Sequence, residues 1–300
     1  MLATNHDRIV NGYASDLALS DVPNVIYAVF GDTLFESRDA GCNWKAWVAS
    51  PALARDAGHI ASARAGYVYV YTEDTLLRAS SSGVTTSPLP ERCRTLAVDS
   101  HDPVHLRAVA VYGASYESVD GGETWNLLGD ATPSIINAAA FDPSDFDHVV
   151  AGVLGAGLVA TYDGGRTWTF TDMRGSNVFE VKFSSADSRV VWVQADDSLY
   201  RSDNGGKTFL MALRSTASLP FTRALLAPHA HDSNIVAISS WAGISIFNTA
   251  TNSTSVVQTS RPGAFVWSPV DVLYFSAPDE VIIISSNGLV FAATQLHRSN

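Results

Sequence analysis

The chain is short of cysteine and has no long apolar run, and each shortage excludes a class of protein. Its two cysteines, Cys42 and Cys93, are too few for a disulfide framework or for a zinc site built from cysteine alone. In the repeat units described below, Cys42 would lie in a peripheral hairpin and Cys93 where the chain enters the next unit, so we expect free thiols. No stretch approaches the roughly 18 consecutive apolar residues of a membrane span. Residues 1–8 lack the apolar core of a signal peptide, so we expect either a secreted or periplasmic protein whose leader has been removed or a cytoplasmic one.

Charge is also scarce, and most of the basic side chains are arginines. Only 16% of the residues are charged, the formal net charge is −11, and Lys45, Lys182 and Lys207 are the only lysines. The arginines are spread singly, without the clustered basic stripe that nucleic-acid binding needs. We therefore expect neither nucleic acid nor an anionic membrane surface as a partner. The chain is 46% hydrophobic, which allows a large core.

A short glycine-rich segment recurs along the chain. The clearest copy, S-V-D-G-G-E-T-W at 118–125, returns as T-Y-D-G-G-R-T-W at 161–168 and S-D-N-G-G-K-T-F at 202–209, with a variant at 37–44. The first two intervals are 43 and 41 positions, the period of a four-stranded propeller blade. Degraded copies at 79–85, 248–254 and 285–288 bring the number of units to seven.

These units predict an all-β fold. Short apolar or alternating runs bounded by glycine, proline and aspartate surround each copy, as expected for strands. In the fourth unit these runs predict strands at 137–141, 148–153, 157–162 and 168–171. We predict a single seven-bladed β-propeller of four-stranded blades over residues 1–300, with blades starting near residues 15, 60, 95, 135, 178, 222 and 264. A ring of seven blades leaves only short protected edges, and we expect a monomer.

The recurring segment matches the Asp-box, or BNR repeat, S/T-x-D-x-G-x-T-W, and the chain resembles the sialidase-like propellers that carry it. The resemblance covers nearly the whole chain. It implies the fold and leaves the function open, because the repeat occurs in sialidases, xyloglucan hydrolases, sortilin-type receptors and photosystem II assembly factors alike.

We expect the repeated residues to be structural. The Asp or Asn side chain can accept backbone N–H groups across a tight turn, and the glycines supply positive φ. The closing aromatic ring would be buried against the neighbouring sheet, contributing roughly 2 to 3 kcal/mol. The residues concerned are Ser37, Asp39, Trp44, Ser118, Asp120, Gly122, Trp125, Thr161, Asp163, Gly165, Trp168, Ser202, Asn204, Gly206 and Phe209.

Ligand contacts are expected at one face of the ring, where the loops from second to third strand meet the loops that join blades. Carboxylates, arginines and aromatic rings together are suited to sugars and peptides. The ligand-contacting candidates are Asp32, Asp74, Tyr112, Arg174, Asp197, Arg223, Trp241, Arg261 and Asp279. The same loops carry His59, Glu73, Arg92, Asn177, Asp196 and Glu280.

No recognised catalytic or metal-binding pattern is present. The arginine motif of sialidases, F/Y-R-I-P, has no match, because Arg8 and Ile9 are followed by Val10 and Asn11. Asp32 lies near the place of a catalytic carboxylate in two-propeller inverting glycosidases, which need a second carboxylate about 6.5–9.5 Å away. A single ring lacks the second propeller. The run H-A-H-D at 229–232 is better explained as a turn than as a zinc site, and we expect no metal and no cofactor.

The sequence therefore favours a non-catalytic binding propeller for a protein, peptide or glycan. The alternative is a glycoside hydrolase or lyase that uses paired carboxylates at the same face, drawn from Asp32, Asp74, Asp197 and Asp279. A third interpretation, an assembly factor for a membrane complex, rests on the family resemblance alone.

Overall fold

The chain folds into antiparallel sheets only. A computed structural model describes residues 14–39, 43–53, 58–129, 132, 134–216, 224–240, 243–256, 270–277, 280–285 and 290–294. These ranges contain 27 strands, arranged in six four-stranded sheets and one three-stranded sheet, with no helix among them. The predicted all-β class is confirmed, and the number of sheets is compatible with seven blades. Within the same ranges nothing helical is long and apolar enough to cross a membrane.

Each sheet is a meander whose strands pair in chain order. The first three sheets are β1 (Ala14–Leu19), β2 (Ile26–Phe30), β3 (Thr33–Ser37) and β4 (Lys45–Ala49); β5 (His59–Arg64), β6 (Tyr67–Tyr71), β7 (Thr75–Ser80) and β8 (Gly83–Pro88); and β9 (Cys93–Val98), β10 (Leu106–Ala110), β11 (Ser115–Ser118) and β12 (Asn126–Gly129). The next two are β13 (Ile136–Phe141), β14 (Val149–Val153), β15 (Gly157–Thr161) and β16 (Thr169–Arg174); and β17 (Val178–Phe183), β18 (Val191–Ala195), β19 (Ser198–Ser202) and β20 (Leu210–Arg214). The last two are β21 (Leu226–Pro228), β22 (Ile235–Ser240), β23 (Gly243–Asn248) and β24 (Ser253–Val256); and β25 (Val270–Ala277), β26 (Glu280–Ser285) and β27 (Val290–Thr294).

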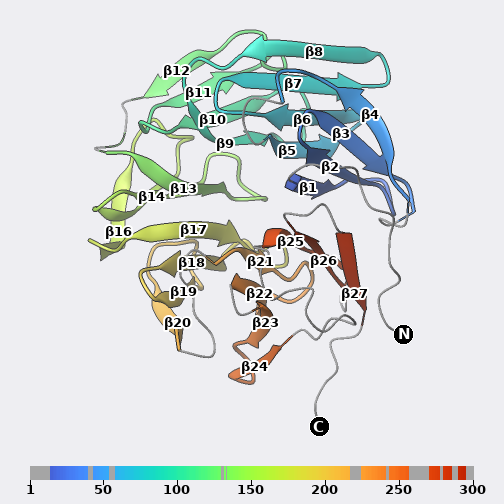
Figure 1. Cartoon of the computed structure of the whole chain (residues 1–300). Helices are drawn as coiled ribbons and strands as arrows, with labels where there is room; N and C mark the ends of the chain where they lie inside the picture. The colour runs from blue at the N-terminus through green and yellow to red at the C-terminus, as the bar shows by residue number, and fades with distance from the viewer. Residues whose placement is uncertain are drawn as a thin grey trace.

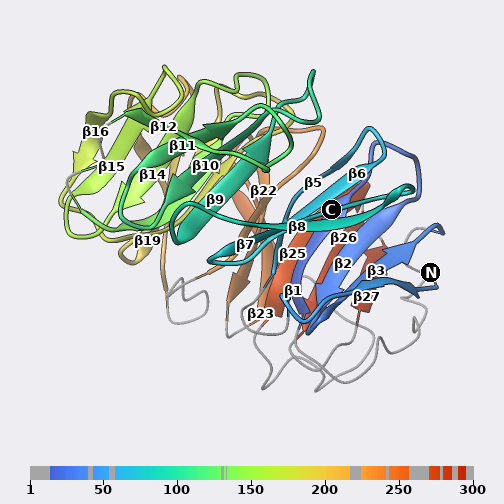
Figure 2. The ribbon, with the colours of Figure 1, turned by 90° about the horizontal axis from the view of Figure 1, so that it is seen from above.

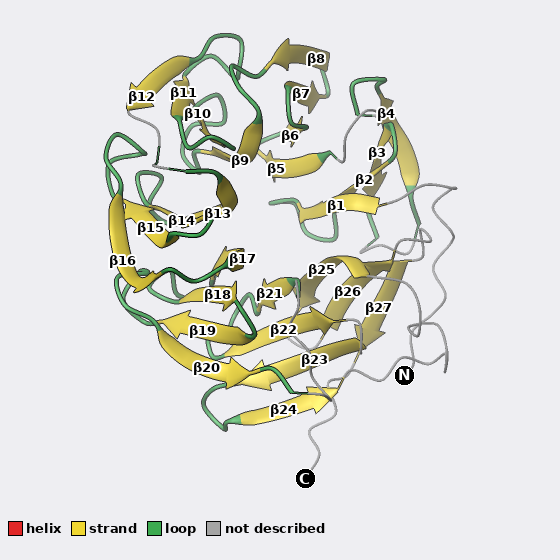
Figure 3. Ribbon diagram, turned by 60° about the vertical axis from the view of Figure 1, so that its left-hand side comes forward, coloured by secondary structure: helices red, strands yellow, loops and turns green. Residues whose placement is uncertain are grey.

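The sheets surround a common centre, and the first strand of each sheet, here called the inner strand, lies nearest to it (Figure 3). The ring closes because β1 contacts β25 (Figures 1 and 2). The predicted blade starts at 222 and 264 lie outside the described residues.

The core lies between neighbouring sheets. Every residue of β2, β10, β14 and β18 is buried, because both faces of these second strands are covered by the adjacent sheets. One cluster combines Val150 and Leu158 of the fourth sheet with Val181 and Val193 of the fifth. The outer strands face solvent, and Leu210 on β20 is 77% exposed. Burial therefore decreases from the middle of each sheet to the rim of the ring.

The glycine-rich repeats at 118–125, 161–168 and 202–209 form turns between the third and fourth strands of their sheets, here called box turns. In the box turn at 161–168, the hydroxyl of Thr161 donates to the Asp163 carboxylate at 2.7 Å and accepts the Gly165 N–H at 2.9 Å. The same carboxylate accepts the Thr167 N–H at 2.9 Å. Trp168 packs against the cluster that links the third and fourth sheets. The turn therefore joins the local hairpin to the interface between sheets.

Candidate functional site

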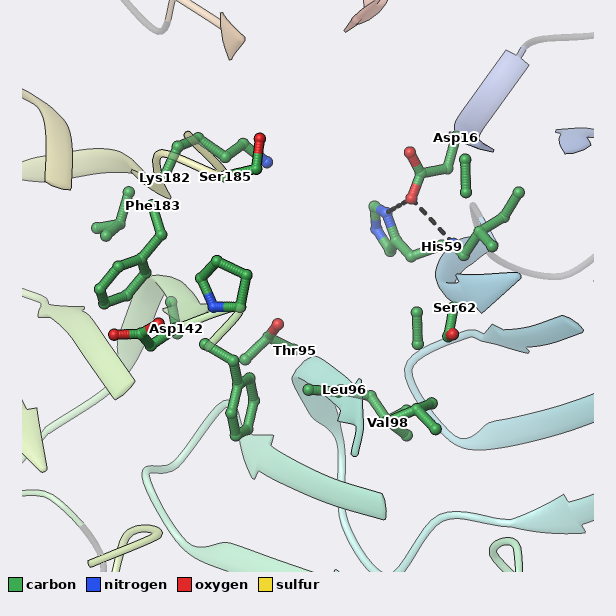
Figure 4. A pocket seen from close by; sticks show the side chains of 18 of the residues that line it. Asp16, His59, Ser62, Thr95, Leu96, Val98, Asp142, Lys182, Phe183 and Ser185 are labelled. Carbon is green, nitrogen blue, oxygen red and sulfur yellow. Dashed lines mark hydrogen bonds and ion pairs between the residues drawn. The ribbon is translucent and has the colours of Figure 1, made fainter. Parts of the chain in front are cut away.

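The structure contains a central cavity of about 820 Å³. Its lining comes from six inner strands, β1, β5, β9, β13, β17 and β21, and from the turns that follow several of them (Figure 4). A volume of about 300–1,000 Å³ is typical of ligand sites in proteins. The cavity is therefore the place where residues from many sheets can contact one ligand.

Most inner strands carry a β-bulge near their start, where the register shifts by one residue against the second strand. A bulge leaves one residue unpaired and redirects its side chain, and bulges are frequent beside functional sites. The residues left unpaired are Ser15, Ala61, Arg94, Asn137, Phe179 and Asp271. Ala61, Arg94, Asn137 and Phe179 line the cavity. The bulges thus place a cation, an amide and an aromatic ring in three successive sheets.

The Asp16 carboxylate and the His59 ring lie close together at the cavity. The Asp16 carboxylate accepts the N–H groups of Leu17 at 2.8 Å and Ile60 at 2.9 Å, which holds it across the first two sheets. The His59 Nδ1 lies 3.6 Å from Asp16 Oδ2 (Figure 4). The centroid of the His59 ring lies 5.4 Å from that of Tyr71. The Asp16 carboxylate is therefore already engaged within the protein.

A buried pair, Asp142 and His148, lies after β13, and Asp142 of this pair lines the cavity. The Asp142 carboxylate lies 3.0 Å from the Nδ1 of His148 and accepts the N–H of Ser144 at 2.8 Å. Burial by itself raises the pKa of Asp142, but the hydrogen bonds from His148 and Ser144 outweigh it and the net shift is downward. Because the His148 ring also packs edge-on against the Phe183 ring of the fifth sheet, with centroids 5.1 Å apart, this pair belongs to the packing between sheets.

Five of the predicted ligand-contacting residues are described, and none of them lines the central cavity: Asp32, Asp74, Tyr112, Arg174 and Asp197. Tyr112 is 54% exposed. The carboxylate of Asp74 accepts the Thr75 hydroxyl at 2.8 Å, and the guanidinium of Arg174 lies over the Phe170 ring at 4.5 Å. Their contact with a ligand stays a prediction. Arg223, Trp241, Arg261 and Asp279 lie outside the described residues.

The cavity residues that sequence reasoning missed are on inner strands. Asp16, Arg94 and Asn137 each lie within three residues of a strand start, but the sequence does not reveal a bulge there. Of the cavity residues just described, only His59 had been identified, as part of a loop between blades. A polar residue near the start of a predicted inner strand is the one signal that could have found the others.

Comparison with known proteins supports the fold and leaves the family open. No family model matches the chain. Dispase autolysis-inducing protein from Streptomyces mobaraensis is 31% identical over 268 residues, covering 75% of this chain. The chain spans 66% of that relative's length, just under two thirds.

Several solved structures are similar to the chain. A structure described as YCF48 bound to D1 peptide has a TM-score of 0.71 at 16% identity and covers 98% of this chain and 96% of its own. The GH74 enzyme of Niastella koreensis has a TM-score of 0.72 at 16% identity, and this chain spans 55% of its length. Both are β-propellers, so the predicted propeller fold is confirmed.

Proposed function

We propose that the chain is a non-catalytic binding propeller, of the Asp-box type, whose ligand is a segment of another protein. The observation that carries the proposal is the central cavity, into which three sheets direct an arginine, an amide and an aromatic ring. An amide both donates and accepts, so it can pair with the backbone of an extended peptide. A solved propeller with a bound peptide, and a relative named for its effect on a protein, support this choice of ligand.

The box turns support the assignment to the Asp-box propellers. Ser118 and Ser202 occupy the place of Thr161, and each accepts the N–H of the second glycine, at 2.8 and 2.9 Å. The same hydrogen bond therefore recurs in three sheets. The single-domain organisation, the monomeric state and a secreted or periplasmic location belong to the same proposal.

Dispase is the first protein to test, because the relative's name connects it with that enzyme. The chain is immobilised and dispase is passed over it, and in parallel dispase is incubated with the chain while the intact band is followed on a gel. We expect saturable binding and faster loss of intact dispase than with heat-unfolded chain. A library of displayed random peptides is screened on the same surface. Absence of binding both to dispase and to every displayed peptide would contradict the proposal.

A glycoside hydrolase is the second candidate, favoured by the similarity to the GH74 enzyme. It is tested by incubating the purified chain with xyloglucan and measuring new reducing ends, with Asp32→Asn as the matched variant. Turnover that Asp32→Asn abolishes would replace the binding proposal. The carboxylate of Asp32 accepts the hydroxyl of Thr33 at 2.7 Å, an interaction that the amide oxygen of Asn can keep.

A further inference from the structure

We infer that Arg94, Asn137 and Phe179 form a carboxylate-binding subsite in the central cavity. On this inference, which rests on the proposed function, the bound protein segment presents a carboxylate next to an apolar side chain. The carboxylate would contact Arg94 and Asn137, and the apolar group would contact Phe179.

The three residues are brought together by the same irregularity in three successive sheets. Each is the unpaired residue of a bulge in β9, β13 or β17, and each lines the cavity. β13 contacts both β9 and β17, so the three bulges are neighbours around the ring. A bulge repeated at one level of consecutive inner strands places three side chains at one level of the cavity.

One nitrogen of the Arg94 guanidinium is hydrogen-bonded to a neighbouring strand, and the other two are available to a ligand. Its Nε donates to the carbonyl oxygen of Ile136 at 3.1 Å, which ties the guanidinium to the strand that carries Asn137. The described part of the chain offers no hydrogen bond or ion pair to its Nη1 and Nη2. A guanidinium with two free N–H groups in a fixed plane matches the two oxygens of a carboxylate.

The described acidic side chains of the cavity near this level already have partners. Asp16 is held by two backbone N–H groups and His59, and Glu180 lies 3.1 Å from the Nζ of Lys182. These interactions leave the positive charge of Arg94 for a ligand.

Asn137 and Phe179 supply the rest of the subsite. Both side chains are partly exposed, and among the residues with described side chains neither the Asn137 amide nor the Phe179 ring has a polar or ring partner. The amide can donate to a carboxylate oxygen or pair with a peptide group, and the ring can cover an apolar side chain. The ligand class that satisfies all three is a peptide carboxylate flanked by an apolar residue.

Two sources could supply this carboxylate, namely the C-terminus of a protein and an Asp or Glu side chain. Fluorescent heptapeptides separate them. One set ends in Phe with a free carboxylate, a second set has the same sequences with an amidated end, and a third is amidated and carries an internal Glu beside Phe. Binding of the first set alone identifies a C-terminus, and equal binding of the first and third identifies any carboxylate.

The first experiment uses two small probes and three proteins. Binding of N-acetylphenylalanine and of its amide is measured by saturation-transfer NMR and calorimetry on the wild type, on Arg94→Gln and on Arg64→Gln. Arg64 is the last residue of β5, whereas Arg94 lies near the start of β9, and both line the cavity. Arg64→Gln therefore removes the same charge from the same cavity at a different level. Near-ultraviolet circular dichroism checks that each variant is folded.

We expect the carboxylate probe to bind the wild type and Arg64→Gln equally, and to bind Arg94→Gln about tenfold or more weakly, as expected for a lost charge-assisted pair. The amide probe should bind all three proteins weakly. Equal affinity of the carboxylate probe for wild type and folded Arg94→Gln, or no binding to the wild type, would overturn the inference. Peptides or dispase that still bind in that case would leave the proposed function standing, because their binding is measured separately.

Discussion

The box turn at 161–168 allows a sharp test, because the chain contains its own reference for one substitution. Asp163 accepts hydrogen bonds from the Thr161 hydroxyl at 2.7 Å and from the N–H and hydroxyl of Thr167 at 2.9 and 2.7 Å. In the next box turn Asn204 accepts the equivalent N–H of Thr208 at 3.0 Å and donates to its hydroxyl at 2.8 Å. Asp163→Asn should therefore keep the turn, whereas Asp163→Ala should not.

The magnitude follows from these hydrogen bonds. Asp163→Ala loses three of them and leaves a buried threonine hydroxyl without its acceptor, so we expect about 2–4 kcal/mol of lost stability. Asp163→Asn loses the charge but keeps the acceptor, and we expect about 1 kcal/mol at pH 7. For a chain of this length, 1 kcal/mol corresponds to about 2 °C in Tm.

The difference between wild type and Asp163→Asn should depend on pH. Burial raises the pKa of Asp163, but hydrogen bonds from Thr167 and Thr161 outweigh it and lower the pKa from 3.8 to about 2. A folded pKa below the unfolded one stabilises the protein above about pH 4, and this contribution is lost as the pH falls toward 2. Because solvent screens the site, we expect about 1 kcal/mol of change.

The assay is urea unfolding of the wild type, Asp163→Asn and Asp163→Ala at pH 7, 5, 4 and 3. The advantage of wild type over Asp163→Asn should shrink between pH 4 and pH 3. The reasoning is refuted if Asp163→Asn is as unstable as Asp163→Ala at pH 7, or if the gap between wild type and Asp163→Asn is the same at every pH.

Three further perturbations test the packing. Gly165→Ala should lower the free energy of unfolding by about 2–3 kcal/mol, since φ is +95° and the new Cβ would meet a neighbouring serine oxygen at 2.1 Å. Gly155→Ala, at φ +69° with open space around it, should lower it by about 1 kcal/mol. Equal losses in the two variants would contradict this reasoning. Arg107→Gln should cost about 3 kcal/mol, since it removes a buried guanidinium that contacts the Glu117 carboxylate and the Phe146 carbonyl oxygen. Exposed Arg189→Gln should stay within about 0.5 kcal/mol in the same unfolding experiments. Burial raises the pKa of the Cys93 thiol to about 12, so in a Cys42→Ser background a thiol reagent at pH 8 should react at least about a hundredfold more slowly with native than with urea-unfolded protein. Rapid reaction of this native variant would disprove the burial of Cys93.

The strands of the fourth sheet show how accurately the sequence predicts where strands begin and end. The predicted strands at 137–141, 148–153 and 157–162 correspond to β13, β14 and β15 within one residue at each end. The outer strand was predicted at 168–171 and forms over Thr169–Arg174. The predicted outer strand ends too early because an exposed outer strand has no apolar pattern that marks its end.

The H-A-H-D run at 229–232 forms a turn, as the sequence predicts, and its own residues hold that turn together. The Nδ1 of His229 accepts the N–H groups of His231 at 3.1 Å and Asp232 at 3.0 Å, which closes the turn between β21 and β22. A side chain that accepts backbone N–H groups two and three residues ahead needs only its neighbours in the sequence.

The sequence by itself determined the strand content, the period of the blades and the turns that close them, because each depends on residues close together in the chain. Only the tertiary structure decided which side chains meet at the centre. Arg94, Asn137 and Phe179 are about 40 residues apart in the sequence. They share one cavity because β9, β13 and β17 each carry a bulge near their start and the ring brings these three bulges together. A bulge depends on the pairing of one strand with the next, so no single segment of the sequence contains it.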